Sequence, residues 1–158
     1  TMPTYDIKEE ERPSTPTATV RVLATLDRIP QEMGRIFSEV YGYLASIGVA
    51  PVGAPFACYH SMSGRTVGME VGTAVAKAVP EHGRGRAGQL PDGTVAVTWH
   101  IGPYEALRNA YEAIEAWMKA CGRAPGGPPC EFYFTDPRQE PDPSKWRTEV
   151  VWRTQRRG

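Results

Sequence analysis

The sequence has little of what marks a nucleic-acid-binding or membrane protein. Its 158 residues include 18 basic and 18 acidic side chains, and no basic stripe precedes the last few residues, so we expect no binding to nucleic acid. No apolar run is long enough to span a membrane. The first residues, TMPTYDIKEEER, lack the basic and then apolar pattern of a signal peptide. We therefore expect a cytoplasmic protein that does not bind membranes.

The chain is also poor in cysteine and histidine. The three cysteines, Cys58, Cys121 and Cys130, have no spacing typical of a metal site, and the sequence has no GxSxG motif and no phosphate-binding loop. We expect neither a metal nor a cofactor, and we interpret the cysteines as buried thiols in a reducing compartment. The length predicts a single domain over residues 1–158. The oligomeric state is not predicted.

Glycine and proline, by contrast, are abundant, and their positions indicate an internal repeat. Residues 48–59 (GVAPVGAPFACY) and 122–133 (GRAPGGPPCEFY) are identical at six positions with a constant separation of 74 residues. The same separation aligns two apolar series, each with the spacing of one helix face. These series are Met33, Phe37, Val40, Leu44, Ile47 and Leu107, Tyr111, Ile114, Met118, Cys121. We interpret the chain as a duplication, with a first repeat over about 17–77, a linker over about 78–91 that allows a strand near 87–90, and a second repeat over about 92–154. The stretch 5–11 allows either a short edge strand or a loose arm.

Each repeat predicts the order strand, helix, strand, strand. An alternating apolar run (19–26 or 94–101) predicts the first strand. The helix that follows is expected to end at Gly48 or Gly122, because glycine readily adopts the left-handed conformation of a helix end. A Pro/Gly loop then leads into the second and third strands. Two such units predict an α+β fold with a largely antiparallel sheet and two helices on one of its faces.

Alternation along the strands assigns candidate residues to the faces of the sheet. In the strand 130–135, the apolar face is expected to lie under the helices, which leaves Glu131 and Tyr133 on the other face. In the last strand, Glu149 and Val151 share one face. The face away from the helices is therefore the expected place of a site.

The repeats place a Tyr on each second strand and a Glu on each third strand: Tyr59 with Glu70, and Tyr133 with Glu149. Adjacent antiparallel strands can bring each pair within reach. A carboxylate beside aromatic rings suits an organic cation, because ring faces attract cations. A core position for each ring, and a solvated position for each Glu, remain the alternatives. Further rings are candidates for the same site: Trp99, Tyr104 and Trp146.

Three segments, TVAVTWHIGPYEAL, APGGPPCEFYFTDP and WRTEVVW, resemble the second half of GyrI-like small-molecule-binding domains, and GMEVGTAV resembles their first half. The resemblance covers about Tyr5 to Thr154. It implies a duplicated fold with a central ligand cleft, shared with the BmrR-type multidrug effector-binding domains, in which a buried Glu and Tyr rings bind lipophilic cations. The resemblance implies that this Glu is Glu149 here, and we place the cleft on the face opposite the helices.

Two functions follow from this resemblance. The first is a stand-alone multidrug-binding protein for planar lipophilic, often cationic, aromatic compounds. The alternative is a hydrolase of cyclopropane-bearing DNA-alkylating natural products, with Glu149 and Tyr133 as its catalytic pair. An adaptor for a protein such as gyrase is a third possibility. The sequence does not separate the first two, because one Glu–Tyr pair serves both. The expected ligand-binding residues are Glu149, Tyr133, Tyr104, Trp99, Val151, Glu70, Tyr59 and Trp146.

Overall fold

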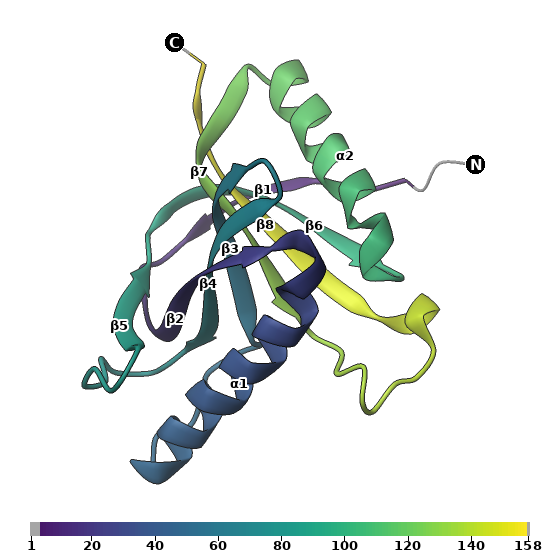
Figure 1. The fold of residues 1–158 in the computed structure, drawn as a ribbon. Coiled ribbons are helices and arrows are strands. Elements are labelled where there is room, and N and C mark those ends of the chain that lie inside the picture. Colours follow the sequence, from purple (N-terminus) through teal and green to yellow (C-terminus); the bar gives the residue numbers. More distant parts are fainter. Residues whose placement is uncertain (1–3, 158) are drawn as a thin grey trace. The chain divides into compact units, whose positions relative to one another are not determined.

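The structure, a computed structural model, describes residues 4–157. This part of the chain contains two α-helices and eight strands (Figure 1), and it has the α+β fold class that the sequence predicts. The chain divides into two compact units. We call residues 13–92 the first-repeat unit. The second-repeat unit combines the residues up to Arg12 with those from Gly93 onward.

The first-repeat unit is an antiparallel sheet covered by one helix. Its elements are β2 (Thr15–Thr25), α1 (Ile29–Ser46), β3 (Phe56–Ser63), β4 (Thr66–Ala74) and β5 (Gly85–Leu90). The strand order is β3-β4-β2-β5. Helix α1 packs against β2 and β4, and it buries Ile36, Val40 and Leu44. Two of these three residues belong to the predicted helix face.

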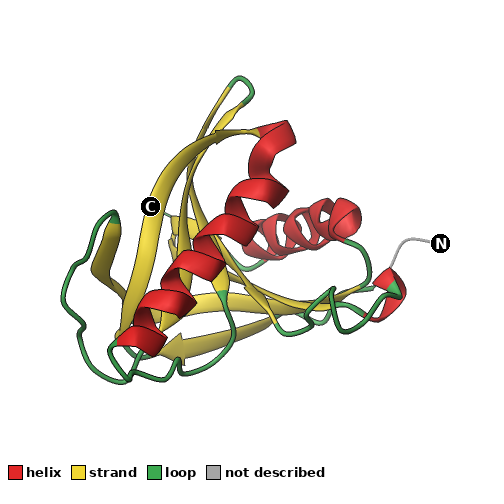
Figure 2. Ribbon diagram, turned by 60° about the horizontal axis from the view of Figure 1, so that its bottom comes forward, coloured by secondary structure: helices red, strands yellow, loops and turns green. Residues whose placement is uncertain are grey.

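The second-repeat unit has the same architecture. Its elements are β1 (Lys8–Arg12), β6 (Gly93–Ile101), α2 (Leu107–Ala120), β7 (Arg123–Tyr133) and β8 (Arg147–Arg156). The strand order is β1-β6-β8-β7. Helix α2 packs against β6, β7 and β8. Figure 2 shows the helices in red and the strands in yellow. The hydrophobic core between α2 and the sheet contains Ala96, Leu107, Ala110, Ile114, Met118 and Val150.

The matching strand orders bear out the predicted duplication, and they add one strand to each unit. Residues 78–91, expected as a linker, contain β5, which pairs with β2. The N-terminal segment forms β1, which pairs with β6. Each predicted strand-helix-strand-strand unit therefore gains one edge strand. In the first repeat this strand is β5, which follows the repeat in the chain, and in the second it is β1, which comes from the N-terminal segment.

The predicted helix ends are confirmed. Gly48 and Gly122 each follow the last helical turn and have positive φ values of 70° and 67°. Side chains with a Cβ are disfavoured in this conformation, because the Cβ approaches the neighbouring carbonyl oxygen. The glycines that revealed the repeat are thus required by backbone geometry.

Replacing Gly48 with Ala is expected to lower the free energy of unfolding by about 1–2 kcal/mol. A Cβ at this position would meet no atom within 4 Å, so the loss comes from the backbone conformation alone. Gly42, inside α1, is the matched control, because its Cβ would also meet nothing and its φ is not positive. Gly42→Ala is expected to stabilise by about 0.5–1 kcal/mol. Urea unfolding of both variants measures the difference, and equal effects would contradict the assignment.

Two expectations about the second repeat are wrong. Strand β7 begins at Arg123 rather than Cys130, so it includes the expected Pro/Gly loop. This stretch has a register shift between Pro125 and Pro129, and side chains of β8 donate hydrogen bonds to its carbonyl oxygens. The interpretation of the cysteines as buried thiols is also wrong, because Cys121 is an exposed free cysteine, and Cys58 and Cys130 are disulfide-bonded.

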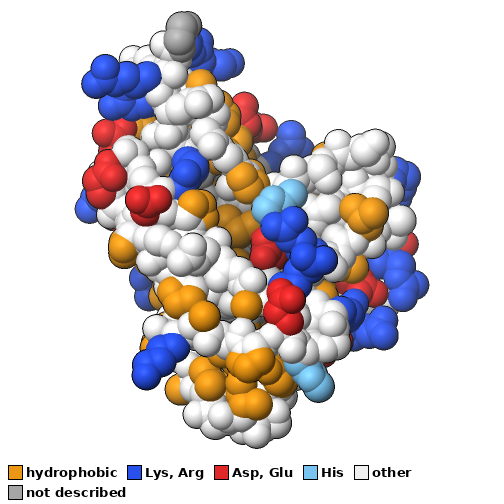
Figure 3. All heavy atoms as spheres, turned by 90° about the vertical axis from the view of Figure 1, so that its left-hand side faces the viewer, with side chains coloured by type: hydrophobic (Ala, Val, Ile, Leu, Met, Phe, Trp, Pro, Cys, Tyr) orange, Lys and Arg blue, Asp and Glu red, His pale blue; other side chains and the backbone are white. Residues whose placement is uncertain are grey.

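The surface mixes charges of both signs, as the equal numbers of basic and acidic residues suggest. On the face drawn in Figure 3, basic and acidic side chains lie beside one another with hydrophobic side chains between them. In residues 4–157, neither helix combines the length and the apolar character that crossing a membrane requires.

Candidate functional site

The register of β7 and β8 decides which candidate residues can meet. Phe132 lies opposite Glu149, and Tyr133 lies opposite Thr148. Directly opposed residues of an antiparallel pair point to the same side of the sheet, and their neighbours in the chain point to the other side. Tyr133 and Glu149 therefore lie on opposite faces. The predicted pairing of these two residues is wrong.

The side of the sheet that α2 covers carries a buried carboxylate that the sequence analysis did not select. Glu131 is 6% exposed and lies opposite Val150, a residue of the α2 core. The hydroxyl of Tyr133 donates to Glu131 Oε1 at 2.7 Å. The hydroxyl of Tyr111, which extends from α2, donates to Oε2. Each oxygen of the carboxylate thus accepts a hydrogen bond, as a buried charged group requires.

Aromatic rings surround the same position. The Tyr104 ring contacts Tyr133 edge-on with centroids 5.8 Å apart, and it contacts Trp146 at 4.8 Å. Tyr111 contacts Trp152 edge-on at 5.8 Å. Burial raises the pKa of the Tyr104 hydroxyl, and the negative charges of Glu131 and Asp136 raise it further. We call Glu131, Tyr104, Tyr111, Tyr133, Trp146 and Trp152 the aromatic site.

A buried hydroxyl adjoins the aromatic site. Thr148 is fully buried and lies opposite both Tyr133 and His100 in the sheet. Among the described residues, its Oγ1 is a buried side-chain atom without a hydrogen-bond partner. Buried polar atoms nearly always have a partner, so this hydroxyl is available to a water molecule or a ligand.

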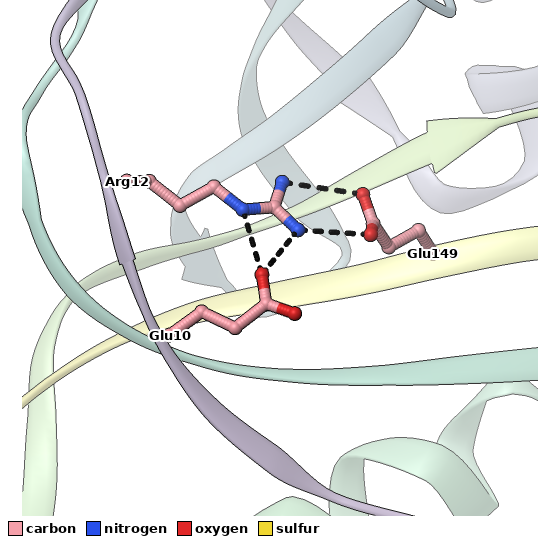
Figure 4. Close-up of polar contacts among 3 residues, drawn as sticks. All are labelled: Glu10, Arg12 and Glu149. Carbon is pink, nitrogen blue, oxygen red and sulfur yellow. Dashed lines mark hydrogen bonds and ion pairs between the residues drawn. The ribbon is translucent and has the colours of Figure 1, made fainter.

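On the opposite side of the sheet, Glu149 already has a cation from the chain itself. Arg12 Nη2 lies 2.9 Å from Glu149 Oε2, and Arg12 Nη1 lies 3.3 Å from Oε1. The same guanidinium contacts Glu10 at 3.0 Å (Figure 4). Glu149 is 8% exposed. The predicted burial of this carboxylate is therefore present, but its negative charge is paired with Arg12.

Two more predicted residues share the side of Glu149. Val151 packs with Val95, Val97 and Phe132. Trp99, which lies opposite Glu149 on β6, is 37% exposed. The guanidinium of Arg147 lies 4.7 Å from the centre of the Trp99 ring. Of the predicted residues, the aromatic site therefore includes Tyr133, Tyr104 and Trp146, but not Glu149, Trp99 or Val151.

The two remaining predicted residues, Tyr59 and Glu70, lie in the first-repeat unit. Tyr59 is opposite Met69, whereas Glu70 is opposite Cys58. The predicted pairing of Tyr59 with Glu70 is therefore wrong for the same reason as in the second repeat. Glu70 accepts a hydrogen bond from Thr19 at 2.6 Å, forms an ion pair with Arg21, and has its Oε1 3.1 Å from Nε2 of His60. Both third-strand glutamates thus have basic partners within their own units.

One sequence signal could have identified Glu131. Tyr111 occupies a position on the predicted apolar face of α2, so its hydroxyl had to point toward the sheet. A buried tyrosine hydroxyl needs a hydrogen-bond partner, and Glu131 is a carboxylate on the strand that α2 covers. The prediction used hydropathy alone, and it therefore placed the Phe residues of this strand under the helix and Glu131 on the opposite face of the sheet.

The chain matches the GyrI-like family, described as a GyrI-like small molecule binding domain, over residues 5–155, and it belongs to this family. None of the curated proteins matches the sequence.

Solved structures share the fold. The C-terminal domain of EcmrR is 20% identical with a TM-score of 0.82, and the match covers 96% of this chain and 98% of that domain. In the EcmrR–DNA complex, the match spans 58% of the longer EcmrR chain, with a TM-score of 0.84. SAV2435 bound to tetraphenylphosphonium is 10% identical, with a TM-score of 0.64 and coverage of 95% and 94%. A hydrolase encoded by lin2189 from Listeria innocua is 14% identical, with a TM-score of 0.65 and coverage of 94% and 91%.

Proposed function

We propose that the protein binds lipophilic, cationic aromatic compounds at the aromatic site. The observation that carries this proposal is the buried Glu131 carboxylate, held by the hydroxyls of Tyr111 and Tyr133. Two tyrosine hydroxyls fix the carboxylate in place. An organic cation entering the site would therefore meet an oriented negative charge.

The rings of the site support a preference for lipophilic cations. A ring face attracts a cation by about 0.5–2 kcal/mol, depending on how far water is excluded. Tyr104 and Trp146, whose centroids are 4.8 Å apart, offer adjacent ring surfaces. Such surfaces also remove the apolar parts of a ligand from water, so charge and area act together. The Thr148 hydroxyl is a candidate partner for a polar group of the ligand.

The site that we propose differs from the one expected at Glu149. A ligand cation at Glu149 would compete with the Arg12 guanidinium, which contacts both carboxylate oxygens. A carboxylate with an internal cation gains less from a second cation, because most of its charge is already compensated. A role of Glu149 in ligand binding stays a prediction. Glu149→Gln tests this role with the same two compounds that are used for Glu131→Gln.

The hydrolase alternative stays a prediction, and this arrangement gives it less support. It required Glu149 and Tyr133 to act on one substrate, whereas the strand register places them on opposite faces. The relatives whose names include a hydrolase and a tetraphenylphosphonium complex are less than 25% identical, and they therefore support a common fold. The phosphonium ligand of SAV2435 nevertheless suggests a suitable probe. The expected lack of nucleic-acid binding also stays a prediction.

Two compounds of similar shape and different charge test the proposal on the wild-type protein. Methyltriphenylphosphonium is a cation, and triphenylphosphine oxide carries the same rings without net charge. We expect the cation to bind at least about tenfold more tightly, because only the cation pairs with the carboxylate and the ring faces. Calorimetric titration measures both affinities. Equal affinities, or binding of neither compound, would contradict the proposed function.

A further inference from the structure

A buried histidine joins the N-terminal segment to the aromatic site. The Tyr5 hydroxyl lies 2.9 Å from Nδ1 of His100, and the two rings stack with centroids 6.0 Å apart. Nε2 of the same imidazole lies 2.9 Å from the carbonyl oxygen of Pro103. His100 is 3% exposed. One side chain therefore contacts both the segment that precedes β1 and the loop that follows β6.

The hydrogen-bonding groups assign the protons in this contact. The Pro103 carbonyl oxygen can only accept a hydrogen bond, so Nε2 of His100 carries a hydrogen and is the donor. In the neutral imidazole Nδ1 then has a free lone pair, and it accepts from the Tyr5 hydroxyl. The Tyr5 hydroxyl is protonated at neutral pH with its ordinary pKa, and burial raises this pKa further. The direction of both hydrogen bonds is thus defined.

The loop held by His100 carries a ring of the aromatic site. Pro103 directly precedes Tyr104, whose ring contacts Tyr133 and Trp146. The amide of Gly102 donates to the carbonyl oxygen of Trp146 at 2.8 Å. A movement of this loop therefore changes the distance between rings that line the site. Conversely, a ligand that packs against Tyr104 holds the loop in place.

We propose that Tyr5 and His100 are positioning residues that couple the N-terminal segment, residues 5–12, to occupancy of the aromatic site. This inference rests on the proposed function, because the ligand must occupy that site. Coupling between two sites is reciprocal. The contact of Tyr5 with His100 strengthens ligand binding, and a bound lipophilic cation strengthens this contact. The N-terminal segment thereby reports whether the site is occupied.

The same segment has a second attachment that serves as an internal control. Arg12 contacts Glu149 on the face of the sheet opposite the aromatic site. This ion pair holds the end of β1 without touching the loop around Pro103. Arg12→Gln should therefore loosen the segment and leave the coupling to the ligand intact. Tyr5→Phe should remove the coupling and preserve the ring contact with His100.

The test combines hydrogen exchange of residues 5–12 with the affinity for methyltriphenylphosphonium. In the wild-type protein we expect the compound to slow exchange in this segment. Tyr5→Phe should weaken binding about fivefold, as expected for one buried hydrogen bond, and abolish the ligand-dependent slowing. Arg12→Gln should speed exchange in the free and bound protein alike, keep the slowing and leave affinity unchanged.

A double substitution separates coupling from a general structural effect. In His100→Gln, the amide group can still donate to the Pro103 carbonyl oxygen, but the ring that accepts from Tyr5 is gone. We expect His100→Gln and Tyr5→Phe each to weaken binding about fivefold, and the double variant to weaken it by no more than either alone, because both break one link. Additive losses would overturn the proposal, as they would indicate separate structural effects.

The outcomes distinguish this inference from the proposed function. If the compound binds and Glu131→Gln weakens binding, yet Tyr5→Phe retains wild-type affinity and ligand-dependent exchange, the coupling is overturned and the site stands. If the wild-type protein binds no phosphonium compound, the proposed function is overturned, and the coupling with it. Thermal unfolding of each variant verifies folding. Tyr5→Phe decides the question even if His100→Gln does not fold.

Discussion

Replacing Glu131 with Gln is expected to weaken binding of methyltriphenylphosphonium by about 1.5–3 kcal/mol, roughly tenfold to a hundredfold. The substitution removes the negative charge and keeps the shape of the side chain. A glutamine oxygen can still accept from one tyrosine hydroxyl, and a hydroxyl can rotate to accept from the amide, so the fold should survive. Binding of triphenylphosphine oxide should change little. Calorimetric titration of both compounds provides the measurement.

The chain supplies a matched control for this substitution in Glu149. Glu149→Gln makes the same chemical change in a carboxylate of similar burial, on the opposite face of the same sheet. It should leave phosphonium binding unchanged, because Arg12 rather than a ligand is its partner. The reverse result, with loss of binding in Glu149→Gln alone, would place the ligand on the face that the resemblance implies and would reject the aromatic site.

Gly72→Ala is expected to have the largest effect on stability, a loss of more than about 3 kcal/mol. Gly72 lies in β4 between Thr19 of β2 and Phe56 of β3. A Cβ at this position would lie 2.0 Å from the carbonyl oxygen of Ala18 and 2.8 Å from Cα of Thr19. These are backbone atoms of β2, which pairs with β4 on one side and with β5 on the other. They cannot move away without breaking hydrogen bonds between these strands. Thermal and urea unfolding measure the loss.

Gly68, in the same strand, shows why the identity of the clashing atom matters. Its Cβ would lie 2.5 Å from the Ser61 hydroxyl oxygen and 3.3 Å from a methyl carbon of Leu23. Both atoms belong to exposed side chains that can rotate away. Gly68→Ala should therefore change the free energy of unfolding by less than about 1 kcal/mol. Similar losses for the two substitutions would mean that the β2–β4 pairing is more yielding than its geometry suggests.

The duplication, the helix faces and the helix ends were predictable from the sequence because they depend on local spacing. Gly48 and Gly122 mark helix ends through a backbone conformation that glycine adopts readily. The apolar spacing of each helix follows from its own periodicity. The edge strands were harder to predict, because β1 pairs with β6, a strand far along the chain. No local pattern of charged residues such as KEEER indicates a distant partner.

The candidate site was predicted in part. Tyr133, Tyr104 and Trp146 belong to the aromatic site. The sequence analysis selected them because they are aromatic residues of the same repeat. Its carboxylate was misassigned, because a one-residue shift in the assumed facing of β7 moves every side chain to the other side of the sheet. The hydrogen bonds from Tyr111 and Tyr133 offset the cost of burying the Glu131 carboxylate. A hydropathy pattern does not include hydrogen bonds between side chains, so it predicted an exposed Glu131.

The origin of the edge strands has a consequence for synthesis of the protein. The first-repeat unit is continuous in the chain, so all of its strands are available once Asp92 has left the ribosome. Strand β1 is synthesised before the other seven strands, yet its partner β6 follows only after the whole first-repeat unit. During that interval β1 is an unpaired strand, and unpaired strands promote aggregation. The sequence of β1, KEEER, is charged at every position. These charges oppose aggregation of the unpaired strand until the second-repeat unit has formed.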